Sequence, residues 1–184
     1  MMDGAAPLSG YFGTIPGGLA GVKCTLRILV NVCRSFLKPA TPEATAALLT
    51  VRTCAARLIK PCQSKDEVCE ATRLHAFVCH SIRYTKDMRT AETVQYPNIT
   101  LTEGYGDCDD KALLFAALAE TVGFETRFVG IGVNGEDFSH VSAQLMIPGT
   151  GWVNAETIPM DDNGTYQPLG WFPPDCTVWM WAHV

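Results

Sequence analysis

The chain has no run of lysine or arginine, and its 184 residues carry a formal net charge of −5. Proteins that bind nucleic acid usually present a basic stripe or patch, so nucleic acid is not expected as a partner. A long apolar run is also missing. The first apolar segment, from Cys24 to Leu37, is interrupted by Arg27 and Arg34, and the first 20 residues contain no Lys or Arg. These patterns argue against a membrane span and a signal peptide, and we expect neither.

The eight cysteines raise the question of a disulfide framework. Such frameworks are typical of short secreted chains, and this sequence shows no export signal. We therefore expect reduced thiols and a cytoplasmic location.

The hydrophobic fraction of 47% is enough to fill one core, so we predict a single domain over residues 22–184. Residues 1–21 hold six glycines and two prolines and show too little periodicity for a regular element. We predict a flexible N-terminal arm there. Two fates are open for it: Tyr11 and Phe12 anchor it on a neighbouring subunit, or it is a solvated tail.

The first half of the domain, residues 22–122, has a helical pattern. Apolar residues recur at helical spacing from Val22 to Leu37. Thr41, followed by a proline, opens a second helix that runs to about Lys60. The segment Ser64-Lys-Asp-Glu67 has the pattern of a capping box and predicts a third helix, from Val68 to about Arg83.

A fourth helix is predicted from Asp107 to about Val122, after a polar stretch from Lys86 to Glu103. Its centre, from Ala112 to Ala119, is apolar on all sides. A helix of that kind is buried on most of its surface, so we expect it to run through the core.

Residues 124–184 change to a strand pattern. Three segments read as antiparallel strands: Thr126 to Val133, His140 to Ile147 and Gly151 to Ile158. The tail from Asn163 is predicted to form covering loops and a final strand. The fold class is therefore α+β.

Cys108 lies at the start of the fourth helix, with Asp107 as the expected N-cap. Unpaired N–H groups and the helix dipole favour negative charge there, which suits both a thiolate and the oxyanion formed in acyl transfer. Asp109 and Asp110 oppose the thiolate by like-charge repulsion, so a cationic imidazole is needed beside the sulfur. The alternative is that Cys108 is a small buried core residue.

His140 is the histidine that opens a predicted strand, and Glu156 follows it across a hairpin. If Ile147 pairs with Gly151, the two side chains are diagonal neighbours; if Leu145 pairs with Gly151, they lie directly opposite. In either register the carboxylate can accept the imidazole N–H and fix its tautomer. The alternatives are a histidine in a surface loop and a strand glutamate facing solvent.

Four spaced blocks of sequence follow one another in this region. They are Gly106-Asp-Cys108-Asp-Asp-Lys-Ala-Leu-Leu, Gly123-Phe-Glu-Thr-Arg-Phe-Val129, His140-Val and Gly151-Trp-Val-Asn-Ala-Glu156. Together they resemble the transglutaminase-like superfamily of papain-type cysteine enzymes, over about Thr93 to Ile158. The resemblance implies a papain-like fold in which a buried cysteine-bearing helix packs on an antiparallel sheet.

By the same resemblance, Cys108 is the nucleophile, His140 the general base and acid, and Glu156 the orienting carboxylate. The family usually has an aspartate where this chain has the longer Glu156. The implied activity is acyl transfer from a protein or peptide substrate. The expected reaction is hydrolysis of a peptide or isopeptide amide through a thioester on Cys108, with transamidation as the same chemistry using an amine.

The doubled aspartate after Cys108 and the segment from Glu92 to Pro97 look most like bacteriophage-encoded members of the superfamily. This implies a location in a bacterial host cytoplasm or in a virion. The alternative function is a phage structural or assembly protein that uses the fold as a packing module and contacts other subunits through the N-terminal arm.

No metal and no organic cofactor are expected. The spacings within Cys62, Cys69, Cys79 and His80 differ from those of paired zinc ligands, so core cysteines are the better interpretation. Gly130-Ile-Gly132 lacks the third glycine and the helix start of a dinucleotide-binding loop.

Overall fold

The computed structural model describes residues 9–13, 18–85, 92–133, 140–160, 163–174 and 176–184. The helices in these ranges are α1 (Gly18–Leu37), α2 (Pro42–Ile59), α3 (Glu67–Ser81), α4 (Pro97–Glu103) and α5 (Cys108–Thr121). The strands are β1 (Ser9–Gly13), β2 (Arg83–Tyr84), β3 (Glu92–Gln95), β4 (Tyr105–Gly106), β5 (Thr126–Val133), β6 (His140–Ile147), β7 (Gly151–Ala155) and β8 (Cys176–His183).

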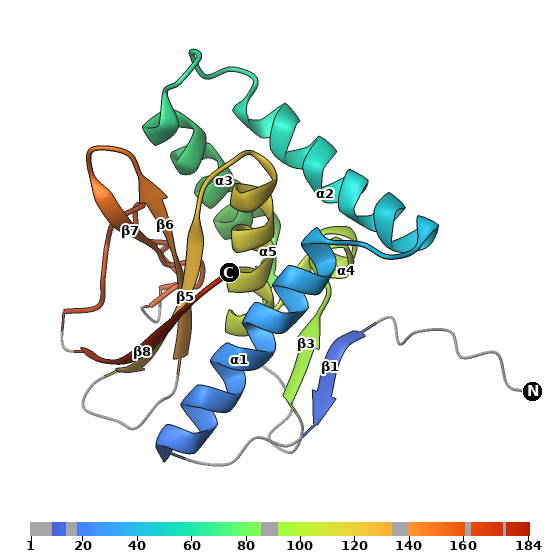
Figure 1. The fold of residues 1–184 in the computed structure, drawn as a ribbon. Helices are drawn as coiled ribbons and strands as arrows, with labels where there is room; N and C mark the ends of the chain where they lie inside the picture. Colours follow the sequence, from blue (N-terminus) through green and yellow to red (C-terminus); the bar gives the residue numbers. More distant parts are fainter. Residues whose placement is uncertain (1–8, 14–17, 86–91, 134–139, 161–162, 175) are drawn as a thin grey trace, which may run out of the picture.

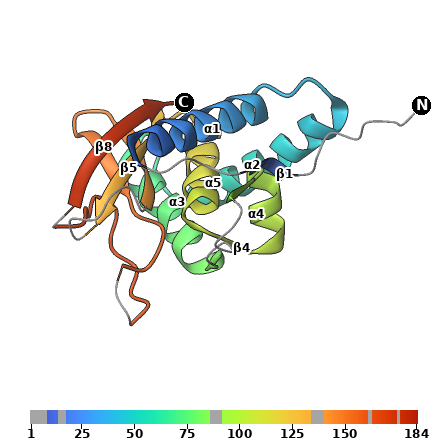
Figure 2. The same cartoon turned by 90° about the horizontal axis from the view of Figure 1, so that it is seen from below.

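A four-stranded antiparallel sheet in the order β7-β6-β5-β8 forms one layer of the molecule. Helix α5 lies against this sheet, and α2, α3 and α4 pack against other sides of α5 (Figure 1). Helix α1 runs alongside α5 and reaches across to β8, as the view from below shows (Figure 2). The predicted α+β class, with a buried cysteine-bearing helix on an antiparallel sheet, is confirmed.

Helix α5 is buried over its whole central length, from Asp109 to Ala119. Its apolar residues face every direction, so burial requires neighbours on all sides, and the sheet and the other helices supply them. Its N-terminus is closed by a capping box: Asp107 accepts the N–H of Asp110, and the Asp110 side chain accepts the N–H of Asp107. The helix that begins at Cys108 is therefore fixed at its first turn as well as along its length.

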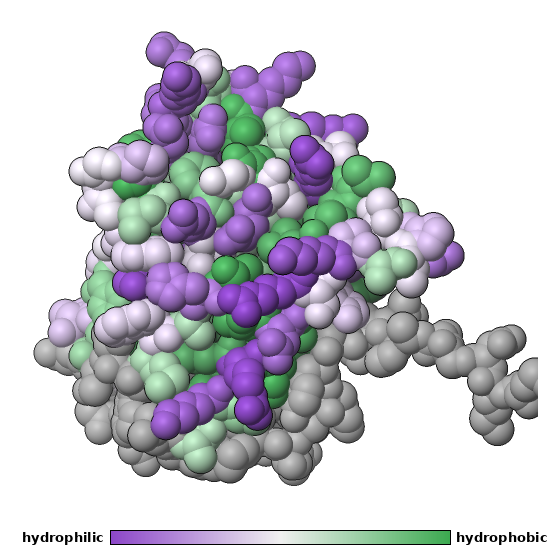
Figure 3. Space-filling view, in the orientation of Figure 1, coloured by the Kyte–Doolittle hydropathy of each residue, from purple (hydrophilic) through white to green (hydrophobic). Residues whose placement is uncertain are grey.

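Helix α1 has one apolar side and one polar side. Val22, Leu26 and Leu29 are buried, whereas Lys23 and Arg27 are exposed. Figure 3 shows a row of hydrophilic side chains following α1 across this face of the molecule. The helix thus covers the core with its apolar stripe, as its spacing predicts.

The predicted N-cap of α2 is confirmed, and that of α3 is not. Thr41 caps α2 by accepting the N–H of Ala44 at 3.2 Å, as predicted. The prediction that Ser64 caps α3 is wrong: Asp66 is the cap and accepts the N–H of Cys69 at 3.0 Å. Asp66 directly precedes the first helical residue, so its carboxylate is the group within reach of the third helical N–H.

Several regular elements lie where none was predicted. Strand β1 pairs antiparallel with β3, and α1 begins at Gly18, so the prediction that residues 1–21 lack a regular element is wrong for Ser9–Gly13 and for Gly18–Gly21. The polar stretch from Lys86 to Glu103 contains β3 and α4, neither of which was predicted. Residues 1–8, 14–17 and 86–91 lie outside the described residues. Both strands are too short for a recognisable alternation, and each needs the other, about 80 positions away in sequence, for its hydrogen bonds.

Cys62 and Cys69 form a disulfide that joins the end of α2 to the start of α3. The expectation of reduced thiols throughout is therefore wrong for this pair. Disulfides persist in oxidising surroundings, so the cytoplasmic expectation loses the support that it drew from the cysteines. The bond also removes both sulfurs from the zinc-ligand set considered above. None of the helices in the described ranges is long and apolar enough to cross a membrane.

Two tryptophans of the sheet flank one arginine. The guanidinium of Arg127 lies 4.3 Å from the ring centroid of Trp152 and 5.1 Å from that of Trp181. Its Nε donates to the side-chain oxygen of Gln144 at 2.8 Å. These rings pack on the sheet itself, and the predicted final strand, β8, carries Trp181.

Candidate active site

Cys108 is the first residue of α5 and is half-buried. Its thiol donates to a carboxylate oxygen of Asp109 at 3.5 Å. Its sulfur accepts the backbone N–H of Val141, which follows His140 at the start of β6. The structure thus brings the cysteine to the strand end that carries the histidine.

His140 and Glu156 form a buried pair. The Nε2 of His140 lies 2.8 Å from Oε2 of Glu156, and the two residues are 5% and 0% exposed. Of the two registers considered, the structure has Ile147 opposite Gly151, which makes the two side chains diagonal neighbours just beyond the end of the ladder. Glu156 also accepts the N–H of Ile158 on its other oxygen, at 3.2 Å.

This pairing leaves the Nδ1 atom of His140 as the nitrogen available to a thiol proton. A neutral imidazole has one protonated nitrogen, and hydrogen bonding to a carboxylate favours the proton on Nε2. The Glu156 carboxylate thus fixes the orientation of the His140 ring and leaves Nδ1 outside the pair.

The two aspartates that follow Cys108 have different structural roles. Asp110 is 1% exposed and accepts the N–H of Gln95 at 2.8 Å, which ties β3 to the helix start. It also belongs to the capping box with Asp107. Asp109 faces the sulfur. The repulsion predicted from the sequence therefore comes from Asp109 and Asp107, and Asp110 is a structural group.

Burial raises the pKa of the Cys108 thiol well above its usual range, and the charges of Asp109 and Asp107 raise it further. The N–H of Val141 acts in the opposite direction and is outweighed. A helix N-terminus alone therefore does not produce a thiolate here. A thiolate at this position would need a cation close to the sulfur.

Three buried side chains near Glu156 were missed by the sequence reasoning. His75 Nε2 donates to the Glu156 carbonyl at 2.6 Å, and the thiol of Cys79 donates to the same oxygen at 3.6 Å. Lys111, one turn after Cys108 on α5, is 0% exposed. The sequence offered one signal, a lysine at the edge of an apolar helix. Which group that lysine faces depends on segments distant in sequence.

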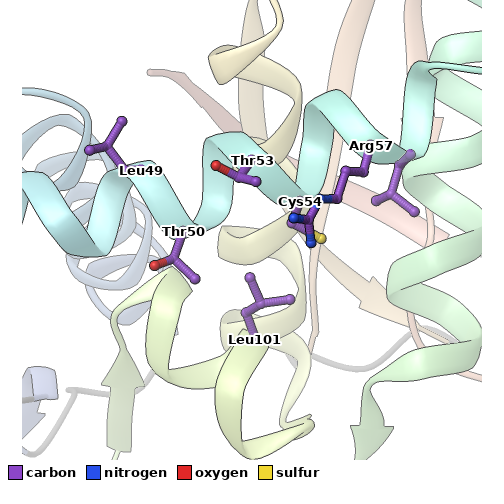
Figure 4. Close-up of a pocket in the computed structure, with 7 residues that line it drawn as sticks. Leu49, Thr50, Thr53, Cys54, Arg57 and Leu101 are labelled. Carbon is purple, nitrogen blue, oxygen red and sulfur yellow. The ribbon is translucent and has the colours of Figure 1, made fainter.

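A separate hollow of about 490 Å³ lies between α2 and α4. Leu49, Thr53 and Arg57 of α2 line one side of it and Leu101 of α4 lines the other (Figure 4). The half-buried thiol of Cys54 also lines this hollow, and burial raises its pKa. No base faces that thiol among the residues lining the hollow.

The described ranges contain no group of three or more His, Cys, Asp and Glu side chains arranged as metal ligands. His140 and Glu156 are hydrogen-bonded to each other.

The comparisons with known proteins agree with this architecture. The model of the transglutaminase-like superfamily matches residues 52–157, a range that includes Cys108, His140 and Glu156. A comparison with curated proteins finds no match.

Solved structures that resemble the chain include the following two. A candidate protease from Parabacteroides distasonis ATCC 8503 is 13% identical with a TM-score of 0.50, and the match covers 74% of this chain and 26% of that one. A candidate cysteine protease from Cytophaga hutchinsonii is 15% identical with a TM-score of 0.46, covering 80% of this chain and 55% of that one. The chain thus spans only part of each of these proteins, and the first likeness shows the fold alone. With more than half of its residues matched by the family model, the chain belongs to the transglutaminase-like superfamily.

Proposed function

We propose that the protein is a cysteine-dependent acyl-transfer enzyme that cleaves a peptide or isopeptide amide through a thioester on Cys108. One observation carries the proposal: a buried His140–Glu156 pair, joined at 2.8 Å, begins the strand whose next N–H contacts the Cys108 sulfur. The proposal assigns Cys108 as the nucleophile, His140 as the base and Glu156 as the orienting carboxylate.

In the first half of the reaction, His140 Nδ1 takes the thiol proton and the sulfur attacks the carbonyl carbon of the amide. The carbonyl oxygen becomes an oxyanion, for which the first-turn N–H groups of α5 are suited donors. The N–H of Cys108 makes no hydrogen bond within the described ranges, so we assign it to this role. The C–N bond then breaks, and the imidazolium gives its proton to the departing amine, which leaves a thioester.

In the second half, His140 removes a proton from water, and the resulting hydroxide attacks the thioester carbon. The C–S bond breaks, the acid leaves and the sulfur recovers the proton. An amine that replaces water gives a new amide instead. Glu156 takes no part in the bond changes, because its proposed function is to hold the ring and stabilise its charged form.

The first test is selective labelling at pH 7. With limiting iodoacetamide, Cys108 is expected to react at least about tenfold faster than Cys54, because the proposal assigns His140 as the base for Cys108, whereas the described residues that line the hollow around Cys54 include no base. Both residues are partly exposed to solvent. Peptide mapping by mass spectrometry gives the two rates. Equal rates would contradict the proposal.

The second step is an activity measurement on the same preparations. Peptides that contain an α-amide or a side-chain isopeptide bond are incubated with the wild type and with Cys108→Ala. Product is expected only with the wild type, and added hydroxylamine diverts a thioester to a hydroxamate. The hydroxamate-to-acid ratio separates transfer to an amine from transfer to water.

The alternative, a phage assembly component, drew on an N-terminal segment free to contact neighbouring subunits. Ser9–Gly13 instead pair with β3 of the same chain. That part of the segment is used inside the molecule, which favours the enzyme. Assembly into a particle is tested by sedimentation of the purified protein.

A further inference from the structure

The backbone carbonyl of Glu156 is held by side chains of α3. Ala155 is the last paired residue of β7, so Glu156 lies one position beyond the sheet ladder. Its carbonyl oxygen accepts the Nε2–H of His75 at 2.6 Å and the thiol of Cys79 at 3.6 Å. Two donors from one helix thus converge on a backbone atom of the residue whose carboxylate binds His140.

His75 is the stronger of these two donors. Its Nε2 lies 2.6 Å from the carbonyl oxygen, whereas the sulfur of Cys79 lies 3.6 Å away and a thiol is a weak donor. Burial lowers the pKa of His75, so its ring is uncharged at neutral pH and carries one N–H. A carbonyl oxygen only accepts, which places that N–H on Nε2.

The ring of His75 is itself held in one orientation. It is 3% exposed and packs edge-on against Phe115, with the ring centroids 6.1 Å apart and the planes at 87°. Phe115 lies on α5, about two turns after Cys108. The imidazole therefore contacts both the helix that carries the cysteine and the segment that carries Glu156.

The simplest role for a buried imidazole of this kind is to satisfy a buried carbonyl. The place of that carbonyl in the site argues for a further role. The Glu156 carboxylate binds His140 at 2.8 Å through one oxygen and the N–H of Ile158 at 3.2 Å through the other. A shift of the Glu156 backbone would move both oxygens, and the His140 ring would follow them or lose its partner. In an active site, a displacement of about 1 Å can cost about 100-fold in rate.

We propose that His75 is a positioning residue, which fixes the backbone of Glu156 so that its carboxylate keeps the His140 ring in the orientation that the reaction at Cys108 requires. The inference rests on the proposed function. In this role His75 contacts neither the Cys108 sulfur nor the substrate. It acts through the position of one backbone atom, the carbonyl oxygen of Glu156.

The test removes the N–H of His75 and keeps a side chain of similar size. In His75→Leu, alkylation of Cys108 by iodoacetamide at pH 7 is expected to slow by about tenfold, while the rate at Cys54 in the same molecules stays unchanged. His75→Gln places an amide N–H near the position of Nε2 and should return the Cys108 rate to within about twofold of the wild type. A residue that only stabilises the fold would leave the ratio of the two rates unchanged in both variants.

The matched control is Leu74→Ala. Leu74 is a fully buried neighbour of His75 on α3, and its truncation should lower the thermal midpoint at least as much as His75→Leu does. The ratio of the Cys108 rate to the Cys54 rate should remain at the wild-type value. If His75→Leu does not fold, His75→Met, which also lacks the N–H, takes its place.

A double-mutant cycle identifies the route of the effect. In the Glu156→Ala background the carboxylate is absent, so adding His75→Leu should change the Cys108 rate by less than about twofold. An undiminished tenfold effect in that background would overturn the inference. So would a wild-type Cys108 rate in the folded variant that lacks the N–H. If wild-type Cys108 itself reacts no faster than Cys54, the proposed function fails instead.

Discussion

Replacing His140 with alanine is expected to slow alkylation of Cys108 at pH 7 by at least about 100-fold. A thiol of ordinary pKa is only a few per cent ionised at this pH. In this site, burial and the charges of Asp109 and Asp107 raise the thiol pKa further. Without the imidazolium the thiolate becomes a trace species. The pH–rate profile, measured with iodoacetamide, should then show one limb that rises at alkaline pH.

The matched control is His183→Ala, which removes a histidine that packs against Trp152 on the sheet. It should leave the rate at Cys108 unchanged. Near-wild-type alkylation of Cys108 in His140→Ala would mean that another group supplies the charge. The role given to the His140–Glu156 pair would then be wrong.

Replacing Gly106 with alanine is expected to destabilise the fold by about 2 to 3 kcal/mol. A Cβ atom at this position would lie 2.6 Å from the Cβ of Asp110 and 3.1 Å from one of its carboxylate oxygens. The Asp110 Cβ is fixed to the backbone of α5, so the strand or the helix must move. That carboxylate also holds the N–H of Gln95, so the shift reaches β3.

Gly149→Ala provides the comparison for this prediction. Gly149 has a φ of +79° and no atom within 4 Å of an added Cβ, so its cost is backbone strain alone, about 1 kcal/mol. Denaturant unfolding of the two variants gives the difference. A Gly106→Ala protein no less stable than Gly149→Ala would contradict the close approach of β4 to α5.

The sequence was sufficient to predict those features that depend on interactions between neighbouring residues. Three features could be predicted because each depends on a few adjacent residues. They are the cap at Asp107, the apolar residues on all sides of α5 and the short turn between Ile147 and Gly151. The hairpin register brings Glu156 to His140. The sequence left that register open, and the candidate residues were named from the four spaced blocks that resemble the family.

The features that sequence reasoning missed depend on contacts between distant segments. Strand β1 forms its ladder hydrogen bonds with β3, which is distant in sequence. The side chain of Lys111 is surrounded by Ile82, Glu156 and Tyr166, which also come from other segments. In isolation a lysine in the first turns of a helix reads as a solvated charge. Burial at that point is a property of the assembled fold.

The position of α5 has a consequence for how long the site lasts. Because this helix is enclosed by the sheet and by the other helices, no small local opening can release it. Cys108 therefore lies on a segment that should unfold only when the whole domain unfolds, unlike a cysteine placed on a loop. Its working lifetime should equal the lifetime of the native state, and site and fold should be lost together.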